Sequence, residues 1–258
     1  MSTPPPRKSL GQHFLVDDNI LGVIARLAEL DASDVALEIG PGLGALTNVL
    51  ASRCGHVHAV ELDLRLEPSL RAIGAAPNVS LHWGDALKLD LTALDPAPTK
   101  LVANLPYNVA TPIVAESLDR LPGIDLWCVM VQREVADRFF AVPSTKAYGA
   151  VSVLIQLAAV RTGFHPVSRN VFRPPPNVDS ALVAFRRIAL PDDFGGIRRI
   201  VEGAFAHRRK TLANSLQLAD VASRDAVVAA LASLGVDASV RAEALEPPVF
   251  VELARRLR

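Results

Sequence analysis

Short apolar runs alternate with longer amphipathic segments through the first half of the chain. The runs are rich in Val and Leu, and they cover residues 35–39, 57–62, 79–83, 100–105 and 126–131. The segments between them, such as 43–53 and 109–121, carry apolar residues three and four positions apart, which is the spacing of an amphipathic helix. Strands that alternate with helices predict a mostly parallel sheet covered by helices on both faces.

The pattern changes after Pro143. Residues 152–164 and 180–188 are compatible with two further strands or with a helix and strands, and a proline-rich loop, 171–178, separates them. Residues 130–140 carry charges at helical spacing, which predicts an amphipathic helix.

From about Pro191 onward the spacing of apolar residues is helical throughout. The pair Gly195-Gly196 marks a break in the chain close to this point. We therefore expect an α/β domain over residues 1–190 and a small all-helical domain over residues 191–258.

Composition narrows the class of protein. With 258 residues, half of them apolar, the chain can form one large domain with a smaller one attached. Its two cysteines, Cys54 and Cys128, do not suggest a disulfide framework and favour a cytoplasmic protein with reduced thiols. The N-terminus lacks the apolar stretch of a secretory signal, and the run 149–160 is too short and too polar to span a membrane.

The charges balance overall but not locally. The chain has 27 basic and 27 acidic side chains, which taken alone argues mildly against a nucleic-acid partner. Between Val160 and Lys210, however, the sequence has ten basic and four acidic residues, a local excess of six positive charges. Such a segment is either a face for a polyanion or a solvated surface balanced elsewhere.

A glycine-rich turn follows the first predicted strand. Gly40, Gly42 and Gly44 have the spacing G-x-G-x-G, which differs from the G-x-G-x-x-G of dinucleotide-binding proteins. Glu61 ends the second strand, where a carboxylate can accept hydrogen bonds from both ribose hydroxyls of a nucleotide cofactor. These features suit a nicotinamide enzyme and an adenosylmethionine enzyme alike.

Two further strands end in polar residues. Asp85 follows the third strand, where it can cap the next turn or accept a hydrogen bond from the exocyclic amine of adenine. The fourth strand ends in Asn104-Leu105-Pro106-Tyr107, an amide and an aromatic ring at a strand end. Because the carboxyl ends of parallel strands share one edge of the sheet, these residues and the glycine turn predict one ligand site.

These motifs resemble the small-subunit ribosomal RNA adenine dimethyltransferase family along nearly the whole chain. The matching segments are GQHFL (11–15), EIGPGLGALT (38–47), VELD (60–63), GDAL (84–87), NLPYN (104–108), VFRPPPNVDSALV (171–183) and FAHRRKTLANSL (205–216). The last two point away from the macrolide-resistance methylases, which share the core but act on the large subunit. The resemblance implies a Rossmann-like class I methyltransferase domain with a mostly parallel seven-stranded sheet, and S-adenosylmethionine as cofactor.

The resemblance gives the NLPY motif a chemical meaning. Adenine N6 is a poor nucleophile, and two hydrogen-bond acceptors stabilise the positive charge that develops on it. The Asn104 side-chain oxygen and a main-chain carbonyl of the Leu105-Pro106 turn can supply them, while Tyr107 stacks on the base. The family suggests that Phe172 closes the other side of the ring.

The resemblance also implies the remaining contacts. It places His13 and Leu15 at the methionine end of the cofactor, and Gly40, Gly42, Glu61, Asp85 and Asn104 complete the expected cofactor site. It assigns RNA binding to the segment 205–216, which we expect to be one helix with an apolar stripe of Phe205, Leu212 and Leu216. The RNA-binding residues on it are Arg208, Arg209, Lys210 and Asn214, and contacts of this kind position RNA without reading its sequence.

The function implied is dimethylation of N6 on two adjacent adenosines in a hairpin loop near the 3′ end of small-subunit rRNA. The expected substrate is a partly assembled 30S particle, and the expected enzyme is a cytoplasmic monomer with a role in small-subunit biogenesis. Two alternatives are a non-catalytic assembly factor and a transcription-factor-like nucleic-acid-binding relative. The glycine spacing and the NLPY motif argue against an oxidoreductase, and Cys54, His56 and His58 lack a fourth ligand for a metal.

Overall fold

The computed structural model describes residues 4–7 and 10–257, and it divides the chain into two compact units. Unit 1 takes the chain as far as Ala136 together with Arg161–Arg187, and unit 2 takes Asp137–Val160 together with the chain from Ile188. The second boundary lies close to the expected one at residue 190. The segment Asp137–Val160 differs from expectation, since the sequence pattern had placed it in the first domain.

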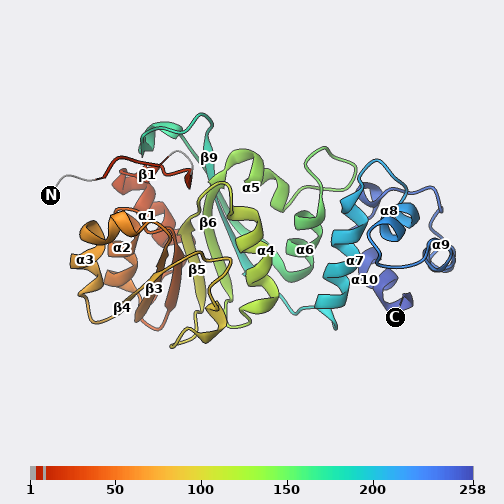
Figure 1. Cartoon of the computed structure of the whole chain (residues 1–258), viewed down its shortest axis with the longest axis horizontal. Coiled ribbons are helices and arrows are strands. Elements are labelled where there is room, and N and C mark those ends of the chain that lie inside the picture. The colour runs from red at the N-terminus through yellow and green to blue at the C-terminus, as the bar shows by residue number, and fades with distance from the viewer. Residues whose placement is uncertain (1–3, 8–9, 258) are drawn as a thin grey trace. The chain divides into compact units, whose positions relative to one another are not determined.

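Unit 1 is built on a mixed sheet (Figure 1). The sheet has seven strands in the order β4-β3-β2-β5-β6-β9-β7, and β2 to β6 run parallel while β9 pairs antiparallel with β6. The five strands expected from the apolar runs are confirmed. The strands are β2 Val35–Ile39, β3 His56–Glu61, β4 Val79–Trp83, β5 Lys100–Asn104, β6 Leu126–Gln132, β7 Ala159–Val167 and β9 Ser180–Arg187.

Helices alternate with the strands of unit 1, as the sequence pattern predicts. They are α1 Asp18–Leu27, α2 Ala45–Arg53, α3 Glu67–Gly74, α4 Ala110–Arg120 and α5 Arg133–Phe139. Asp17 begins α1, because its carboxylate accepts the main-chain N–H groups of Asn19 and Ile20 at 2.9 and 3.1 Å. A separate two-stranded ribbon pairs β1 (Phe14–Leu15) antiparallel with β8 (Phe172–Arg173).

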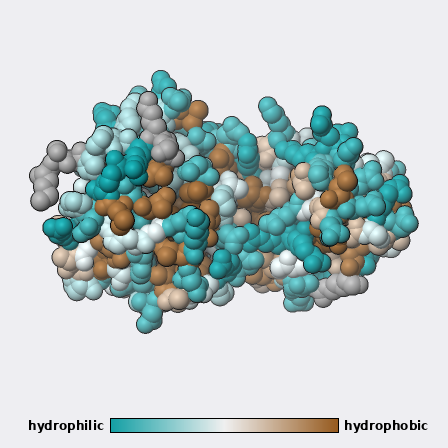
Figure 2. Space-filling model, in the orientation of Figure 1, coloured by the Kyte–Doolittle hydropathy of each residue, from teal (hydrophilic) through white to brown (hydrophobic). Residues whose placement is uncertain are grey.

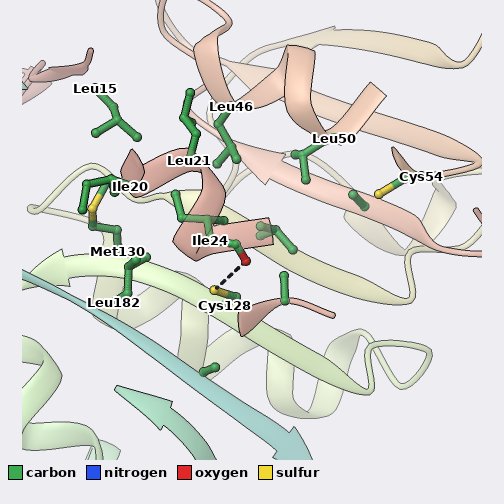
Figure 3. Packing of buried hydrophobic residues seen from close by; sticks show 14 of the residues in the cluster. Leu15, Ile20, Leu21, Ile24, Leu46, Leu50, Cys54, Cys128, Met130 and Leu182 are labelled. Atoms are coloured by element: carbon green, nitrogen blue, oxygen red, sulfur yellow. Dashed lines mark hydrogen bonds between the residues drawn. The ribbon is translucent and has the colours of Figure 1, made fainter. Parts of the chain in front are cut away.

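The core of unit 1 lies between the sheet and its first helices (Figure 3). Ile24 of α1 and Leu50 of α2 pack with Met130 of β6 and Leu182 of β9, and all four are almost completely buried. The Cys128 thiol lies in the same cluster, 3.9 Å from the Ile24 carbonyl. Burial raises the pKa of Cys128 to about 12, so this thiol stays protonated and unreactive at neutral pH.

Unit 2 is helical. Its helices are α6 Ala150–Ala158, α7 Phe194–Ala206, α8 Leu212–Leu218, α9 Arg224–Ser233 and α10 Pro247–Arg256. Residues 152–164 therefore form the end of a helix followed by a strand, which settles the alternative left open by the sequence. The Tyr148 hydroxyl donates to the Leu245 carbonyl at 2.8 Å, and this buried contact ties the segment before α6 to the C-terminal part of unit 2.

The segment 205–216 does not form the single helix expected. Helix α7 ends at Ala206 and α8 begins at Leu212, so the basic residues fall on the turn between them. Ser215 holds this turn, since its hydroxyl donates to the Gly203 carbonyl at 2.7 Å and accepts from the His207 main-chain N–H at 3.2 Å. The apolar residues do have helical spacing, but they belong to two helices, and the buried Ser215 stabilises the turn between them.

Hydrophilic residues cover most of the face seen in Figure 2, with smaller hydrophobic patches between them. In the described part of the chain, we find no helix that has both the length and the apolar character needed to cross a membrane.

Replacing Arg187 with alanine should lower the free energy of unfolding by about 2–4 kcal/mol. The half-buried guanidinium donates to the carbonyls of Leu118, Leu121 and Ile124, at 2.7, 3.1 and 2.5 Å. It also lies 4.8 Å from the centre of the Trp127 ring. Without it the carbonyls at the end of α4 lose their partners, and urea unfolding measures the loss.

Arg186→Ala is the matched control. Its ion pairs with Glu29 and Asp125 are partly exposed, so the expected loss is less than about 1 kcal/mol. Equal losses in the two variants would contradict a special role for Arg187 at the end of α4.

Candidate active site

A cavity opens at the carboxyl ends of β2, β3, β4 and β5, where a parallel sheet binds its ligands. Its volume is about 1060 Å³ with its open mouth included. Most of the residues expected at the site lie in its wall. These are His13, Leu15, Gly40, Gly42, Glu61, Asp85, Asn104, Leu105, Pro106 and Tyr107.

The glycine turn after β2 brings the main chain itself to the cavity. Gly42 has a φ of +60°, and a Cβ built there would lie 3.0 Å from the Phe14 ring. A side chain at this position would therefore meet both backbone strain and a buried ring. Gly40 donates its main-chain N–H to the Val60 carbonyl at 2.9 Å, which joins the turn to β3.

Glu61, at the end of β3, is buried in the cavity wall. One carboxylate oxygen accepts the Gly42 N–H at 3.2 Å and the other accepts the Asp63 N–H at 2.8 Å. Burial raises the pKa of Glu61, and these two hydrogen bonds oppose the shift. Each oxygen keeps a lone pair for a further donor, as a pair of ribose hydroxyls would provide.

Asp63 ties the N-terminal segment to the cavity wall, a contact that sequence reasoning missed. Its buried carboxylate accepts from the Gln12 side chain at 3.0 Å and from Arg65 at 2.6 Å. The Arg65 guanidinium holds the pKa of Asp63 far below its usual range. The segment 10–15 lines the cavity, so this carboxylate fixes one of its walls.

Asp85 caps the turn after β4 and also lines the cavity. Its Oδ1 accepts the Leu87 main-chain N–H at 3.0 Å, which caps the turn after β4. Its Oδ2 lies 3.7 Å from the Lys88 ammonium, and the residue lines the cavity. A cap and a ligand-binding carboxylate are therefore compatible at this position.

Asn104 ends β5 and is anchored through its amide nitrogen. This nitrogen donates to the His13 carbonyl at 3.2 Å, which leaves the side-chain oxygen as an acceptor. The next residue offers a second acceptor. Leu105 donates its N–H to Met130, and Pro106 accepts from Val109, while in the described residues no hydrogen bond reaches the Leu105 carbonyl.

Tyr107 stands beside these acceptors in the cavity wall. Its hydroxyl lies 2.6 Å from the Ser180 hydroxyl at the start of β9. Its ring stacks with the His13 ring, with centres 5.7 Å apart and planes inclined by 28°. His13 in turn donates from Nδ1 to the Pro174 carbonyl at 2.8 Å. Burial raises the pKa of Tyr107, so its ring stays neutral at physiological pH.

Some expected residues do not line this cavity. The Phe172 ring has no exposed surface and packs in the core cluster of unit 1, so the structure does not bring it to the cavity. The four expected RNA-binding residues belong to unit 2. Arg208 binds the Tyr148 carbonyl at 3.0 Å and Glu243 at 3.3 Å, Arg209 and Lys210 are exposed, and Asn214 is partly buried.

Glu38 is a cavity residue that sequence reasoning missed. It lies within β2 and is only 1% exposed, and neither its Oε2 nor the Thr47 hydroxyl has a hydrogen-bond partner among the described residues. Burial raises its pKa to about 8. The sequence contained an indication of this role. Burying an acidic side chain inside an apolar strand is unfavourable, and a position next to a glycine turn makes a functional role a reason to retain it.

Glu38→Gln should change how stability depends on pH. The pKa of Glu38 is about 8 in the folded protein, against an ordinary value of 4.5. Between these pH values the unfolded chain releases a proton that the folded protein keeps, so stability falls as the pH rises toward the folded pKa. The free energy of unfolding of the variant minus that of wild type, measured by urea unfolding, should therefore increase between about pH 5 and pH 8.

Glu67→Gln, at an exposed position of α3, serves as the control and should show no such trend. A constant difference between Glu38→Gln and wild type over this range would mean that Glu38 ionises normally in the folded protein.

The carboxylate acceptors and the glycine turn fit an adenosine-containing cofactor. The main chain at Gly42 leaves no room for a side chain, Glu61 keeps lone pairs for hydroxyls, and Glu38 has an unpartnered buried oxygen. The sheet order, the acidic residues at the ends of β3 and β4 and the NLPY motif at the end of β5 together define a class I S-adenosylmethionine-dependent methyltransferase.

Comparisons with solved structures agree on the fold. A dimethyladenosine transferase from Plasmodium falciparum superposes with a TM-score of 0.78 at 24% sequence identity, covering 93% of this chain and 96% of that one. The 23S rRNA methyltransferase ErmE superposes with a TM-score of 0.66 at 30% identity, covering 95% and 99%.

Sequence comparisons reach the same class. A Rubrobacter xylanophilus protein named ribosomal RNA small subunit methyltransferase A is 49% identical over 257 residues, covering 99% of this chain and 96% of that protein. The model of the ribosomal RNA adenine dimethylase family matches residues 5–257. The chain belongs to this family, and it is an rRNA adenine dimethyltransferase that uses S-adenosylmethionine.

Proposed function

We propose that this enzyme dimethylates N6 of two adjacent adenosines in a hairpin loop near the 3′ end of small-subunit rRNA. The observation that carries the chemistry is the pair of acceptors at the end of β5, the Asn104 side-chain oxygen and the Leu105 carbonyl. The choice of subunit is supported by the 49% identical relative, whose name specifies the small subunit. ErmE, named for 23S rRNA, is less similar at 30%.

The cofactor would be held by residues from three strand ends and β1. Glu61 would bind the ribose hydroxyls and Asp85 the adenine amine, with the main chain at Gly40 and Gly42 alongside. His13 and Leu15 would bound the methionine end. Bound S-adenosylmethionine supplies a methyl group on a positively charged sulfur, which makes that methyl group electrophilic.

The target adenine must leave its stack to reach the cavity, and Tyr107 then offers it a ring to stack on. Asn104 Oδ1 and the Leu105 carbonyl each accept one N6–H bond. They localise the lone pair on N6 and stabilise the positive charge that develops there. Pro106 fixes the turn that aims the carbonyl, and it packs against the glycine turn, 3.2 Å from the position of a Cβ at Gly40.

Dimethylation requires the same hydrogen-bond acceptors to position N6 for two successive methyl transfers. After the first transfer the cationic N6 releases a proton to water, and the base then presents one N–H and one methyl group. The Asn104 oxygen or the Leu105 carbonyl binds the remaining N–H while the second methyl group arrives. N6-methyladenosine is therefore an intermediate of the proposed reaction.

The proposed RNA contacts in unit 2 lie at the turn between α7 and α8. Arg209 and Lys210 are exposed there and can approach phosphates, whereas Arg208 already binds Glu243 at 3.3 Å. Asn214 follows in α8. Since the net charge of the chain is zero, we further propose that it acts on a partly assembled 30S particle rather than on naked RNA. We propose as well that it acts in the cytoplasm as a monomer. Tight, salt-insensitive binding to a bare rRNA hairpin would contradict this preference.

A substrate comparison tests the proposal. Small subunits and large subunits that lack the methyl groups, and naked small-subunit rRNA, are each incubated with the enzyme and radiolabelled S-adenosylmethionine. We expect incorporation into small-subunit particles, weaker incorporation into naked RNA and none into large subunits. Binding to small subunits without incorporation would instead favour an assembly factor that does no chemistry.

A further inference from the structure

The folded protein neutralises only part of the positive charge between Val160 and Lys210. Arg186, Arg198 and Arg208 each lie within 3.4 Å of a carboxylate. In the part of the chain that the structure describes, two exposed arginines of unit 1, Arg169 and Arg173, have no carboxylate partner of this kind. Among the described residues neither side chain makes an ion pair, so two full positive charges remain on one short loop.

This loop, residues 168–178, is joined to the ribbon of β1 and β8. Arg173 pairs with Phe14 across the ribbon, and Phe172 pairs with Leu15. Because neighbouring residues of a strand point to opposite faces, the buried Phe172 turns Arg173 toward solvent. The Arg173 guanidinium donates to the carbonyls of Asn170 and Phe172 at 3.1 and 3.0 Å, which orients it without neutralising its charge.

The ribbon places this charge beside the active site. Phe14 and Leu15 of β1 line the cavity, and the segment before β9 runs alongside β1 (Figure 1). His13, whose ring stacks on Tyr107, donates to the carbonyl of Pro174, the residue after Arg173. The loop is therefore attached to the same wall that carries the stacking ring.

The surroundings of the loop suit an anion. Residues 168–178 contain two arginines and no acidic residue. Two acids border the loop, Asp179, which accepts the Arg169 main-chain N–H at 3.0 Å, and Asp17, which caps α1, and among the described residues neither pairs with the side chain of Arg169 or Arg173.

We propose that Arg169 and Arg173 bind the phosphates that flank the adenosine whose base enters the cavity. The proposal rests on the function proposed above, because a base that leaves its stack brings its own backbone to the mouth of the cavity. The loop 168–178 is then a second RNA-binding element, in unit 1, distinct from the turn between α7 and α8. Such contacts strengthen binding through phosphates and do not read sequence.

The test measures how binding depends on salt. The double variant Arg169→Ala/Arg173→Ala, the double variant Arg169→Lys/Arg173→Lys, Arg186→Ala and wild type are titrated against small subunits that lack the methyl groups, over a range of salt concentrations. Arg186 is a matched control because it comes from the same basic segment but is paired with Glu29 and Asp125. Affinity for S-adenosylmethionine is measured in parallel.

For the alanine double variant we expect weaker binding to the particle. The slope of log affinity against log salt should also be less steep by about 1.4, because each of the two lost phosphate contacts on a single strand contributes about 0.7. The lysine variant should regain most of that slope, and Arg186→Ala should behave as wild type. Cofactor affinity should not change.

A wild-type slope in the alanine double variant would overturn the proposal. Failure of the lysine variant to regain the slope would also overturn it, since the arginines would then only maintain the loop. Binding is measured without turnover, so these outcomes stay separate from the proposed function, which fails if wild type binds the particle and forms no methylated adenosine.

Discussion

Replacing Asn104 with alanine is expected to lower the rate of methyl transfer by about 10²–10³-fold, the loss usual when one preorganised hydrogen-bond partner of a developing charge is removed. The Asn104 amide nitrogen is held by the His13 carbonyl at 3.2 Å, so its oxygen is already in place before the substrate arrives. Alanine removes this acceptor and leaves the Leu105 carbonyl to act alone. Single-turnover transfer to small subunits measures the effect directly.

The defect should appear in the chemical step. Binding of the particle should remain close to wild type, and the change in cofactor affinity should be smaller than the change in rate. Asn48→Ala is the matched control, because Asn48 is exposed on α2 and does not line the cavity. A wild-type rate in Asn104→Ala would remove Asn104 from the reaction.

Replacing Tyr107 with alanine is expected to cost about 1–3 kcal/mol in stabilising the extruded base, which corresponds to roughly a 5- to 150-fold loss in kcat/KM. The ring is fixed from two sides, by the Ser180 hydroxyl at 2.6 Å and by stacking on His13. Tyr107→Phe keeps the ring and loses only the hydroxyl contact. It should therefore retain most of the activity, and steady-state kinetics on small subunits compares the two variants.

Ser180→Ala completes this comparison, since it removes the same hydroxyl contact from the other side and should match Tyr107→Phe. Equal losses in Tyr107→Phe and Tyr107→Ala would contradict a stacking role and would point to the hydroxyl instead.

The central strands of the sheet were predictable from sequence because β2, β3, β5 and β6 are buried along nearly their whole length. Apolar runs such as 35–39 and 126–131 form β2 and β6 nearly residue for residue. The cavity residues could also be predicted from sequence, because glycine, acidic and amide residues interrupt the apolar pattern where parallel strands end. Gly42, Glu61 and Asn104 all lie in the wall of one cavity.

What the sequence pattern missed depends on contacts between distant residues. Tyr148 bonds to Leu245, 97 positions away, and this contact places the segment before α6 in unit 2. Ser215 creates a turn inside what looked like one continuous helix. Phe172 is buried in a ribbon with β1 that no local pattern reveals.

The most direct test of the central claim is the identity of the methylated nucleoside. Small subunits that lack the methyl groups are incubated with wild-type enzyme and S-adenosylmethionine, their rRNA is digested, and the nucleosides are identified by mass spectrometry over time. The account predicts that N6-methyladenosine appears first and is converted to N6,N6-dimethyladenosine. A methyl group on another base, or on another atom of adenine, would contradict the role assigned to Asn104, Leu105 and Tyr107.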